Sequence, residues 1–370
     1  MMIDMWSDEK IHEFRETLLS WYDADGRATL PWRQDTSPYR VWVSEIMLQQ
    51  TQVNTVIPYF ERFMTRFPTV QSLAEAPEAD LLKVWEGLGY YSRVRNMQKA
   101  AQQVVGDFQG EWPKTMKELQ TLKGIGPYTA AAIASIAFKE PVAAIDGNAF
   151  RVFSRLFKID SDIAQPATRK EFFELGNKII DPVRPGDFNQ AIMDLGSSFM
   201  TAKNYDSENS PVKAFNAAYL DGTESYYPVK SKAKKAKRVN YAAILVQNDD
   251  DYLWEKRPED GMLANFWTVP LVNIDEFIDD ADVQWTDDEI KIALEGYLLK
   301  NYGISASLSM VEIKPITHVY THQKWYVSVF SAVISSDTPL KQGNWRDFET
   351  LMQDPQPKIQ EKIWKAMQIK

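Results

Sequence analysis

The sequence lacks cysteine altogether and has only three histidines among its 370 residues. The missing cysteines exclude disulfides, thiolate-bound zinc, cysteine-held iron–sulfur clusters and any cysteine nucleophile. No stretch approaches the roughly 18 apolar residues of a membrane-spanning helix, and the acidic start of the chain lacks an apolar signal region. We therefore expect a cytoplasmic protein. The remaining composition, 44% hydrophobic and 25% charged, is that of a soluble chain with two or three domains.

Positive charge is scarce overall, because the formal net charge is −9, but it is concentrated in one place. Six of the nine residues 230–238 are Lys or Arg, and none is a large apolar residue. Such a segment is typical of an exposed linker. Exposed charges act over about 10 Å, so a local basic cluster can meet phosphate even on an acidic protein. Binding of nucleic acid has to be argued from local sites.

The spacing of apolar residues differs on the two sides of this linker. Helical spacing recurs at 44–57, 80–105, 115–122, 128–138 and 168–180, whereas strand patterns occur at 241–247, 252–256 and 325–333. The pattern predicts an all-α domain over 1–225, a basic linker over 226–238 and a small α+β domain over 239–370. Ser44 is expected to cap the first of these helices.

A glycine-containing hairpin is predicted at Leu122-Lys-Gly-Ile-Gly-Pro-Tyr-Thr-Ala-Ala-Ala-Ile133. Glycines allow a tight turn, and the following helix presents unpaired amides and the positive end of its dipole, which suit an anion. An isolated Gly-x-Gly is more often an ordinary connection between two helices.

Two carboxylates could carry glycosidic-bond chemistry. Asp146 precedes a helical pattern, where capping amides and the helix dipole favour its ionised form. Glu45 stands among large apolar residues, which would raise its pKa. A protonated acid beside an ionised carboxylate is the pair that glycosidic cleavage uses. Taken alone, the Asp146 stretch is more typical of a purely structural helix cap, and Glu45 could simply be a residue of a helix's first turn.

Several separate blocks together make one resemblance specific. The sequence resembles the MutY family of A/G-specific adenine DNA glycosylases through Leu30-Pro-Trp-Arg33, Pro38 to Val53, Trp85 to Asn96, the hairpin at 122–133, Asp146-Gly-Asn148 and Met193-Asp-Leu-Gly196. The resemblance implies a helix-hairpin-helix glycosylase domain followed by a Nudix-like domain. It also implies removal of adenine opposite 8-oxoguanine or guanine in double-stranded DNA, after the adenine is flipped into a pocket.

The resemblance assigns roles to the four catalytic candidates. Glu45 would protonate the purine N7, and Asp146 would stabilise the oxocarbenium ion that develops. Tyr128 and Asn148 would help to hold this carboxylate and the sugar. Bifunctional relatives carry a Schiff-base lysine at the Tyr128 position, and tyrosine cannot form an imine. The enzyme is therefore expected to be monofunctional and to need no cofactor.

The resemblance also implies contacts with DNA and the mispaired bases. The expected residues are Trp32, Arg33, Leu48, Gln50, Thr51, Leu88, Tyr90, Lys123, Gly124, Gly126, Tyr320, Thr321 and His322. Leu88 and Tyr90 would act as wedges from a loop tip, with core packing as the alternative. Trp32 and Arg33 would line the adenine pocket or contact phosphate. The hairpin carbonyls of Gln120, Leu122 and Ile125 would hold a monovalent cation.

The sequence departs from the family at the iron–sulfur module. The positions that carry the four cluster cysteines in most members fall on Met200, Ser207, Ser210 and Asn216. We therefore expect no cluster. The loop at about 197–220 would instead be held by packing of Phe199, Tyr205, Phe215 and Tyr219.

The C-terminal region resembles the Nudix-like domain of the family at Lys256 to Pro270. Residues 275–300 lack the Glu-rich pattern of a pyrophosphohydrolase, so hydrolysis is not expected. His318 and His322 are spaced like a helical metal pair, but they lack a third ligand nearby. In the family this stretch is a loop that contacts 8-oxoguanine.

The expected function is thus a monomeric, monofunctional adenine glycosylase acting on double-stranded DNA, with no membrane partner. Two alternatives stay open. One is a glycosylase for thymine or uracil opposite guanine, and the other is a damage-binding protein without catalysis. Protein partners cannot be read from the sequence.

Overall fold

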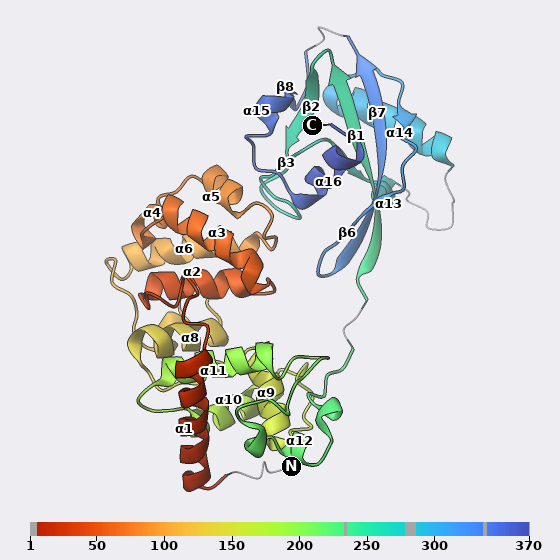
Figure 1. Ribbon diagram of the computed structural model, residues 1–370. Coiled ribbons are helices and arrows are strands. Elements are labelled where there is room, and N and C mark those ends of the chain that lie inside the picture. Colours follow the sequence, from red (N-terminus) through yellow and green to blue (C-terminus); the bar gives the residue numbers. More distant parts are fainter. Residues whose placement is uncertain (1–5, 233–234, 278–285, 336–338, 370) are drawn as a thin grey trace. The chain divides into compact units, whose positions relative to one another are not determined.

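The computed structural model describes residues 6–232, 235–277, 286–335 and 339–369, and these divide into two compact units (Figure 1). The first unit comprises the described residues of Met1–Ala76 and Ser92–Lys232, and the second those of Pro77–Tyr91 and Ala233–Lys370. Ala233 and Lys234 of the predicted linker, and 278–285 of the segment searched for a hydrolase pattern, lie outside the described residues. No described helix has both the length and the apolar content that crossing a membrane requires.

The first unit is helical throughout its described residues, as predicted. Its helices are α1 (Asp8–Asp25), α2 (Pro38–Leu48), α3 (Val53–Arg66), α4 (Val70–Ala74), α6 (Ser92–Gly106), α7 (Met116–Leu119), α8 (Pro127–Phe138), α9 (Gly147–Phe157), α10 (Thr168–Ile179), α11 (Pro185–Ser198) and α12 (Ala217–Leu220), with short 3₁₀ turns at Lys213–Phe215 and Glu224–Tyr226.

Helix α8 is the centre of this unit. Its run of small and apolar residues from Thr129 to Ser135 is buried throughout, and the helix packs against both α2 and α11. Helix α11 in turn packs against α1 and α9, around a core that includes Phe14, Phe153 and Phe188. Small side chains let these helices approach closely, so α8 holds α2 on one side and α11 on the other.

Two predicted helices have different bounds in the structure. The helix expected to start at Ser44 begins at Pro38, a residue suited to the first helical turn, and Ser44 lies buried inside it with Oγ donating to the Val41 carbonyl at 2.8 Å. That helix ends before Gln50, whose φ of 59° interrupts the run. The pattern at 80–105 likewise splits into α5 and α6, because residues 86–91 form a loop with a left-handed backbone at Gly87 and Gly89.

The second unit combines a mixed sheet with helices. Its elements are α5 (Glu78–Trp85), β1 (Lys237–Asn248), β2 (Asp251–Lys256), β3 (Trp267–Thr268), β4 (Leu271–Asn273), α13 (Ile274–Phe277), α14 (Asp287–Tyr302), β5 (Ser309–Met310), β6 (Ile316–Val319), β7 (Gln323–Ile334), β8 (Asn344–Asp347), α15 (Phe348–Leu351) and α16 (Lys358–Ala366).

Two long strands form the middle of the sheet. Strand β1 runs parallel to β7 along its whole length, from Lys237 opposite Gln323 to Asn248 opposite Ile334. Strand β2 pairs antiparallel with β1 through the predicted hairpin, with Gln247 opposite Tyr252. Strands β4, β5 and β6 also pair antiparallel with these two central strands. The core beneath the sheet includes residues of α14, which agrees with the predicted α+β class. The unit also contains Pro77–Tyr91, which the sequence prediction had placed in the helical domain.

Candidate active site

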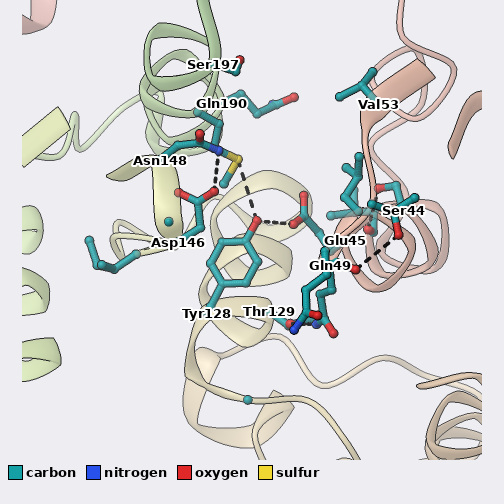
Figure 2. Close-up of a pocket in the computed structure, with 18 of the residues that line it drawn as sticks. Ser44, Glu45, Gln49, Val53, Tyr128, Thr129, Asp146, Asn148, Gln190 and Ser197 are labelled. Atoms are coloured by element: carbon teal, nitrogen blue, oxygen red, sulfur yellow. Dashed lines mark hydrogen bonds between the residues drawn. The ribbon is translucent and has the colours of Figure 1, made fainter. Parts of the chain in front are cut away.

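A cavity of about 740 Å³ opens within the first unit, and residues of α2, α8, α9 and α11 line it (Figure 2). All four catalytic candidates contribute to its wall: Glu45, Tyr128, Asp146 and Asn148. The folding of residues 38–198 brings together side chains that are separated by a hundred positions in the sequence. The cavity is therefore the candidate active site.

Glu45 is buried near the end of α2, with only 6% of its surface exposed. Its carboxylate accepts a hydrogen bond from the hydroxyl of Tyr128, which lies on the neighbouring helix α8. Burial raises the pKa of Glu45 to about 7, while the Tyr128 hydroxyl opposes that rise. The raised pKa agrees with the prediction from its apolar neighbours. At neutral pH a large fraction of Glu45 thus holds a proton that it can donate.

Asp146 caps α9 as predicted. Its carboxylate accepts the Ala149 amide at 2.7 Å and the side-chain amide of Asn148 at 2.7 Å. These donors lower the pKa of Asp146, in the expected direction, but burial outweighs them and raises the pKa above its ordinary value. Gly196 of α11 lies against Asn148, where an added Cβ would come within 2.6 Å of the Asn148 Cβ. The close approach of α11 thus holds Asn148 beside the carboxylate.

The two carboxylates differ in what surrounds them. Asp146 accepts from a backbone amide and a side-chain amide, whereas the hydrogen bond described for Glu45 comes from Tyr128. Negative charge on Asp146 further raises the pKa of Glu45. Donors to the ionised form favour ionisation, so the two amides stabilise the Asp146 carboxylate while burial opposes them. Tyr128 was expected to support Asp146, but its hydroxyl is bonded to Glu45 (Figure 2).

A buried ion cluster supports the far wall of the cavity. Arg33 donates to both oxygens of Asp194, at 2.6 and 2.9 Å, and Arg27 donates to the same carboxylate at 2.7 Å. The side chains of Arg33 and Asp194 are only 7% and 2% exposed. Arg33 lines the cavity, which is one of its two expected roles, and its guanidinium is buried and paired with Asp194. Its contact with phosphate stays a prediction. Trp32 is also buried at this wall, with its ring 5.5 Å from that of Phe60.

Some of the predicted DNA-contact residues join the cavity and others lie elsewhere. Those in its lining are Trp32, Arg33, Leu48, Gln50, Thr51, Gly124 and Gly126. Those outside it are Leu88, Tyr90, Lys123, Tyr320, Thr321 and His322.

The predicted wedge residues occupy the loop between α5 and α6, at a loop tip as expected. Leu88 is 7% exposed and Tyr90 is 46% exposed, with a left-handed backbone at Tyr90. Leu88 is buried, as expected if it packs in the core instead of acting as a wedge.

The predicted hairpin lies between α7 and α8. Gly124 has φ +77°, and an added Cβ would come within 2.7 Å of the Asn96 Cβ, so only glycine fits there. The Lys123 backbone amide donates to the Gln103 side chain at 2.7 Å, and the lysine side chain is exposed. The carbonyl of Leu122 accepts the Ile125 amide at 3.2 Å. The cation at the carbonyls of Gln120, Leu122 and Ile125 stays a prediction.

The predicted opposite-base loop is the turn between β6 and β7. Tyr320 turns inward, with its ring 4.8 Å from that of Trp325 and its hydroxyl buried without a partner among the described residues. Thr321 and His322 are exposed. His318 lies on β6 and not on a helix, and the described residues contain no group of three or more His, Cys, Asp or Glu that could hold a metal.

The loop that replaces the iron–sulfur module is held by hydrogen bonds as well as packing. Glu224 is buried and accepts from the Ser207 hydroxyl and from the Asn216 side chain, the latter at 2.9 Å. Met200 and Ser210 are also buried here, and Ser210 Oγ has no partner among the described residues. A thioether, two hydroxyls and an amide are not the thiolates that iron–sulfur clusters require, so this donor set does not fit such a cluster.

The expected packing in this loop is present for three of the four aromatic residues. Phe199 packs edge-on against Trp21, Phe215 against Phe14, and Tyr205 lies 4.5 Å beneath the Arg155 guanidinium. Tyr219 is half-buried, and its hydroxyl donates to the exposed carboxylate of Glu208.

Sequence reasoning missed several lining residues. Gln190, Met193 and Ser197 line the cavity from one face of α11, and Asp194 holds the two arginines. Their spacing of three and four residues is the signal that could have placed them on one face of α11. Arg169 and Lys230 also line the cavity, but no local pattern connects them with it.

Comparison with known proteins places both units in described families. Residues 43–178 match the HhH-GPD superfamily of base excision DNA repair proteins, and residues 241–366 match the NUDIX domain. Over 90% of its length the chain is 34% identical to an adenine DNA glycosylase of Arabidopsis thaliana. It covers 60% of that relative, less than two thirds of its length. A second adenine DNA glycosylase, from Buchnera aphidicola subsp. Schizaphis graminum, is 30% identical over 95% of this chain and 98% of its own.

A solved structure supports the fold of the helical unit. The structure described as a thermostable thymine-DNA glycosylase matches with a TM-score of 0.52 at 24% identity, over 58% of this chain and 98% of that chain. At that identity the likeness concerns the fold alone.

Proposed function

Since the chain belongs to the family of adenine DNA glycosylases, we propose that it removes mispaired adenine from double-stranded DNA by hydrolysing the N-glycosidic bond. The single observation that carries this proposal is the pair of buried carboxylates in one cavity. Glu45 has a pKa of about 7, and Asp146 is held by two hydrogen-bond donors. The adenine must first leave the base stack of the duplex, because only a flipped nucleotide can enter the cavity.

Proton transfer to the base is the first chemical step. Glu45 gives its proton to N7 of the adenine, which makes the base a neutral leaving group as the C1′–N9 bond breaks. Positive charge then develops on the sugar, and the carboxylate of Asp146 stabilises it. Water then adds to C1′ and loses a proton, which returns to the Glu45 carboxylate, so that the hydrolysis is complete and the acid is restored. Tyr128 orients the Glu45 carboxylate through its hydroxyl, and Asn148 orients that of Asp146.

The reaction is monofunctional, because a tyrosine occupies position 128 and cannot form an imine with the sugar. No iron–sulfur cluster takes part, since the residues at its positions lack thiolates. We extend the proposal to a monomeric, cytoplasmic enzyme that prefers 8-oxoguanine or guanine as the base opposite adenine. In this proposal the opposite base is read partly by Thr321 and His322, which are exposed in the β6–β7 turn.

A single-turnover assay tests this function. The substrates are matched duplexes with one 8-oxoguanine:A, G:A, G:T or G:U pair, each analysed with and without alkali, and iron is determined in the same preparation. We expect adenine release from the first two duplexes, strand scission only after alkali, and no iron. Release of thymine or uracil would favour the alternative glycosylase.

Glu45→Gln separates catalysis from binding, and Glu13→Gln on the exposed face of α1 is the matched control. The Glu45 variant should bind the 8-oxoguanine:A duplex and release no adenine, while the control should behave like the unaltered chain. Tight binding by the unaltered chain without base release would favour a damage-binding protein. Normal cleavage by Glu45→Gln would contradict the assigned role of Glu45.

A further inference from the structure

The start of the basic segment is fixed on the helical unit by two hydrogen bonds. The Ile163 amide donates to the Val229 carbonyl at 3.0 Å. Two residues further on, the Ser231 amide donates to the Asp162 carboxylate at 3.1 Å. The backbone on both sides of Lys230 is therefore bound to residues 162–163. This anchoring places Lys230 in the lining of the catalytic cavity.

Arg169 lines the same cavity from the first turn of α10. Its guanidinium lies 6.0 Å from the ring of Phe150, which also belongs to the cavity wall. Arg169 also lines a smaller, mostly apolar cavity of about 300 Å³ that shares Tyr128 and Phe150 with the first. Arg169 thus stands where the two cavities adjoin.

The cationic side chains of the catalytic cavity fall into two classes. Arg27 and Arg33 are both paired with the buried carboxylate of Asp194, which offsets one of their two positive charges. Arg169 and Lys230 are exposed, and no ion pair joins either of them to a carboxylate among the described residues. Two positive charges therefore remain at the cavity for an incoming anion. The nearby Asp162 carboxylate, which accepts the Ser231 amide, offsets part of the charge of Lys230. Distant carboxylates count for less, because exposed charges act over about 10 Å.

We propose that Arg169 and Lys230 bind phosphates of the DNA strand whose adenosine enters the cavity. This inference rests on the proposed function, which brings a nucleotide with a phosphate on each side to the cavity. Phosphate contacts of this kind position the duplex and carry no sequence information. The first residues of the connection between the two units thereby belong to the DNA-binding surface of the helical unit.

Salt dependence of binding measures such contacts directly. Each phosphate neutralised by a cation contributes about 0.9 to the slope of log affinity against log salt concentration for duplex DNA. Arg169→Ala and Lys230→Ala, each in the Glu45→Gln background so that the substrate persists, are titrated with an 8-oxoguanine:A duplex at several salt concentrations. Lys178→Ala is the matched control. Lys178 is an exposed lysine in the last turn of α10, the helix that carries Arg169, and it does not line the cavity.

We expect each of the two alanine variants to lower the slope by about 0.9 and to weaken binding about three- to tenfold at low salt. Lys230→Arg should restore the slope, and Lys178→Ala should leave it unchanged. Slopes and affinities equal to those of the control would overturn the inference. Failure of the proposed function is distinguishable, because it would appear as no adenine release by the unaltered chain, whatever the salt slopes of the variants.

Discussion

The catalytic cavity and the loop around Glu224 are both buried polar clusters in the helical unit, yet they are built differently. In the loop, Glu224 accepts from Ser207 and Asn216, and Arg155 donates to the carbonyls of Thr201 and Tyr227. These groups bind one another. In the cavity, Glu45 and Asp146 also accept hydrogen bonds from the chain, but both line an open volume and burial raises their pKa values.

The difference separates polar groups that hold a fold from polar groups that act on a ligand. A buried polar side chain is tolerated when the chain itself supplies its hydrogen-bond partners. A desolvated carboxylate that faces a cavity lowers the stability of the fold. Such carboxylates occur at functional sites, where a raised pKa serves proton transfer. The loop and the cavity should therefore respond in opposite ways to the loss of a carboxylate.

Asp146→Asn should give the largest effect. Asparagine caps helices as well as aspartate does, so α9 and the fold should be preserved. The negative charge that stabilises the sugar cation is lost, and we expect the single-turnover rate of adenine release to fall by about 10²–10³-fold. The thermal unfolding midpoint, measured on the same sample, should change little. A rate within tenfold of the unaltered chain would remove Asp146 from the reaction.

Glu45→Gln should make the protein relatively more stable at alkaline pH. The pKa of Glu45 is raised by folding from 4.5 to about 7, so its stabilising contribution is complete below 4.5 and is lost as the pH rises through 7. Glutamine does not titrate. When the pH is raised from 4.5 to 8, the free energy of unfolding of the unaltered chain should fall by about 3 kcal/mol relative to that of the variant. Urea unfolding at both pH values tests this, and parallel changes in the two proteins would contradict it.

Glu224→Ala should destabilise the protein without touching the chemistry. It removes the acceptor of Ser207 and Asn216, and two buried donors left unpaired should cost about 2–3 kcal/mol in the free energy of unfolding. Glu208→Ala is the control, because Glu208 is an exposed carboxylate of the same loop that bonds to Tyr219. Equal stability of the two variants by urea unfolding would show that the polar network does not hold the loop.

Tyr128→Phe should give the smallest effect. Its hydroxyl lowers the pKa of Glu45, so its removal should move that pKa upward and carry the alkaline limb of the rate profile to higher pH. The maximal rate should fall by about fivefold or less, in keeping with one lost hydrogen bond. A pH profile of single-turnover rates measures both quantities. An unshifted limb would mean that Tyr128 does not act through Glu45.

Local signals were sufficient for part of the site. The turn before α9 placed Asp146 at a cap, and the apolar neighbours of Glu45 indicated its raised pKa. The direction of the Asp146 shift could not be predicted, because burial depends on α11, which lies about forty residues further along the chain and packs against α9. The pairing of Arg33 with Asp194 was missed for the same reason, since 161 positions separate the partners.

The sequence by itself determined the two-domain plan, the helical and sheet classes, the family and the absence of cluster ligands, because each follows from local residue type and spacing. The tertiary structure alone decided which groups meet. It placed the Tyr128 hydroxyl in hydrogen-bonding contact with Glu45 and paired Arg33 with Asp194. It also placed Lys230 in the lining of the catalytic cavity. Hydrogen bonds, ion pairs and burial depend on distances across the fold, and the order of residues along the chain does not specify those distances.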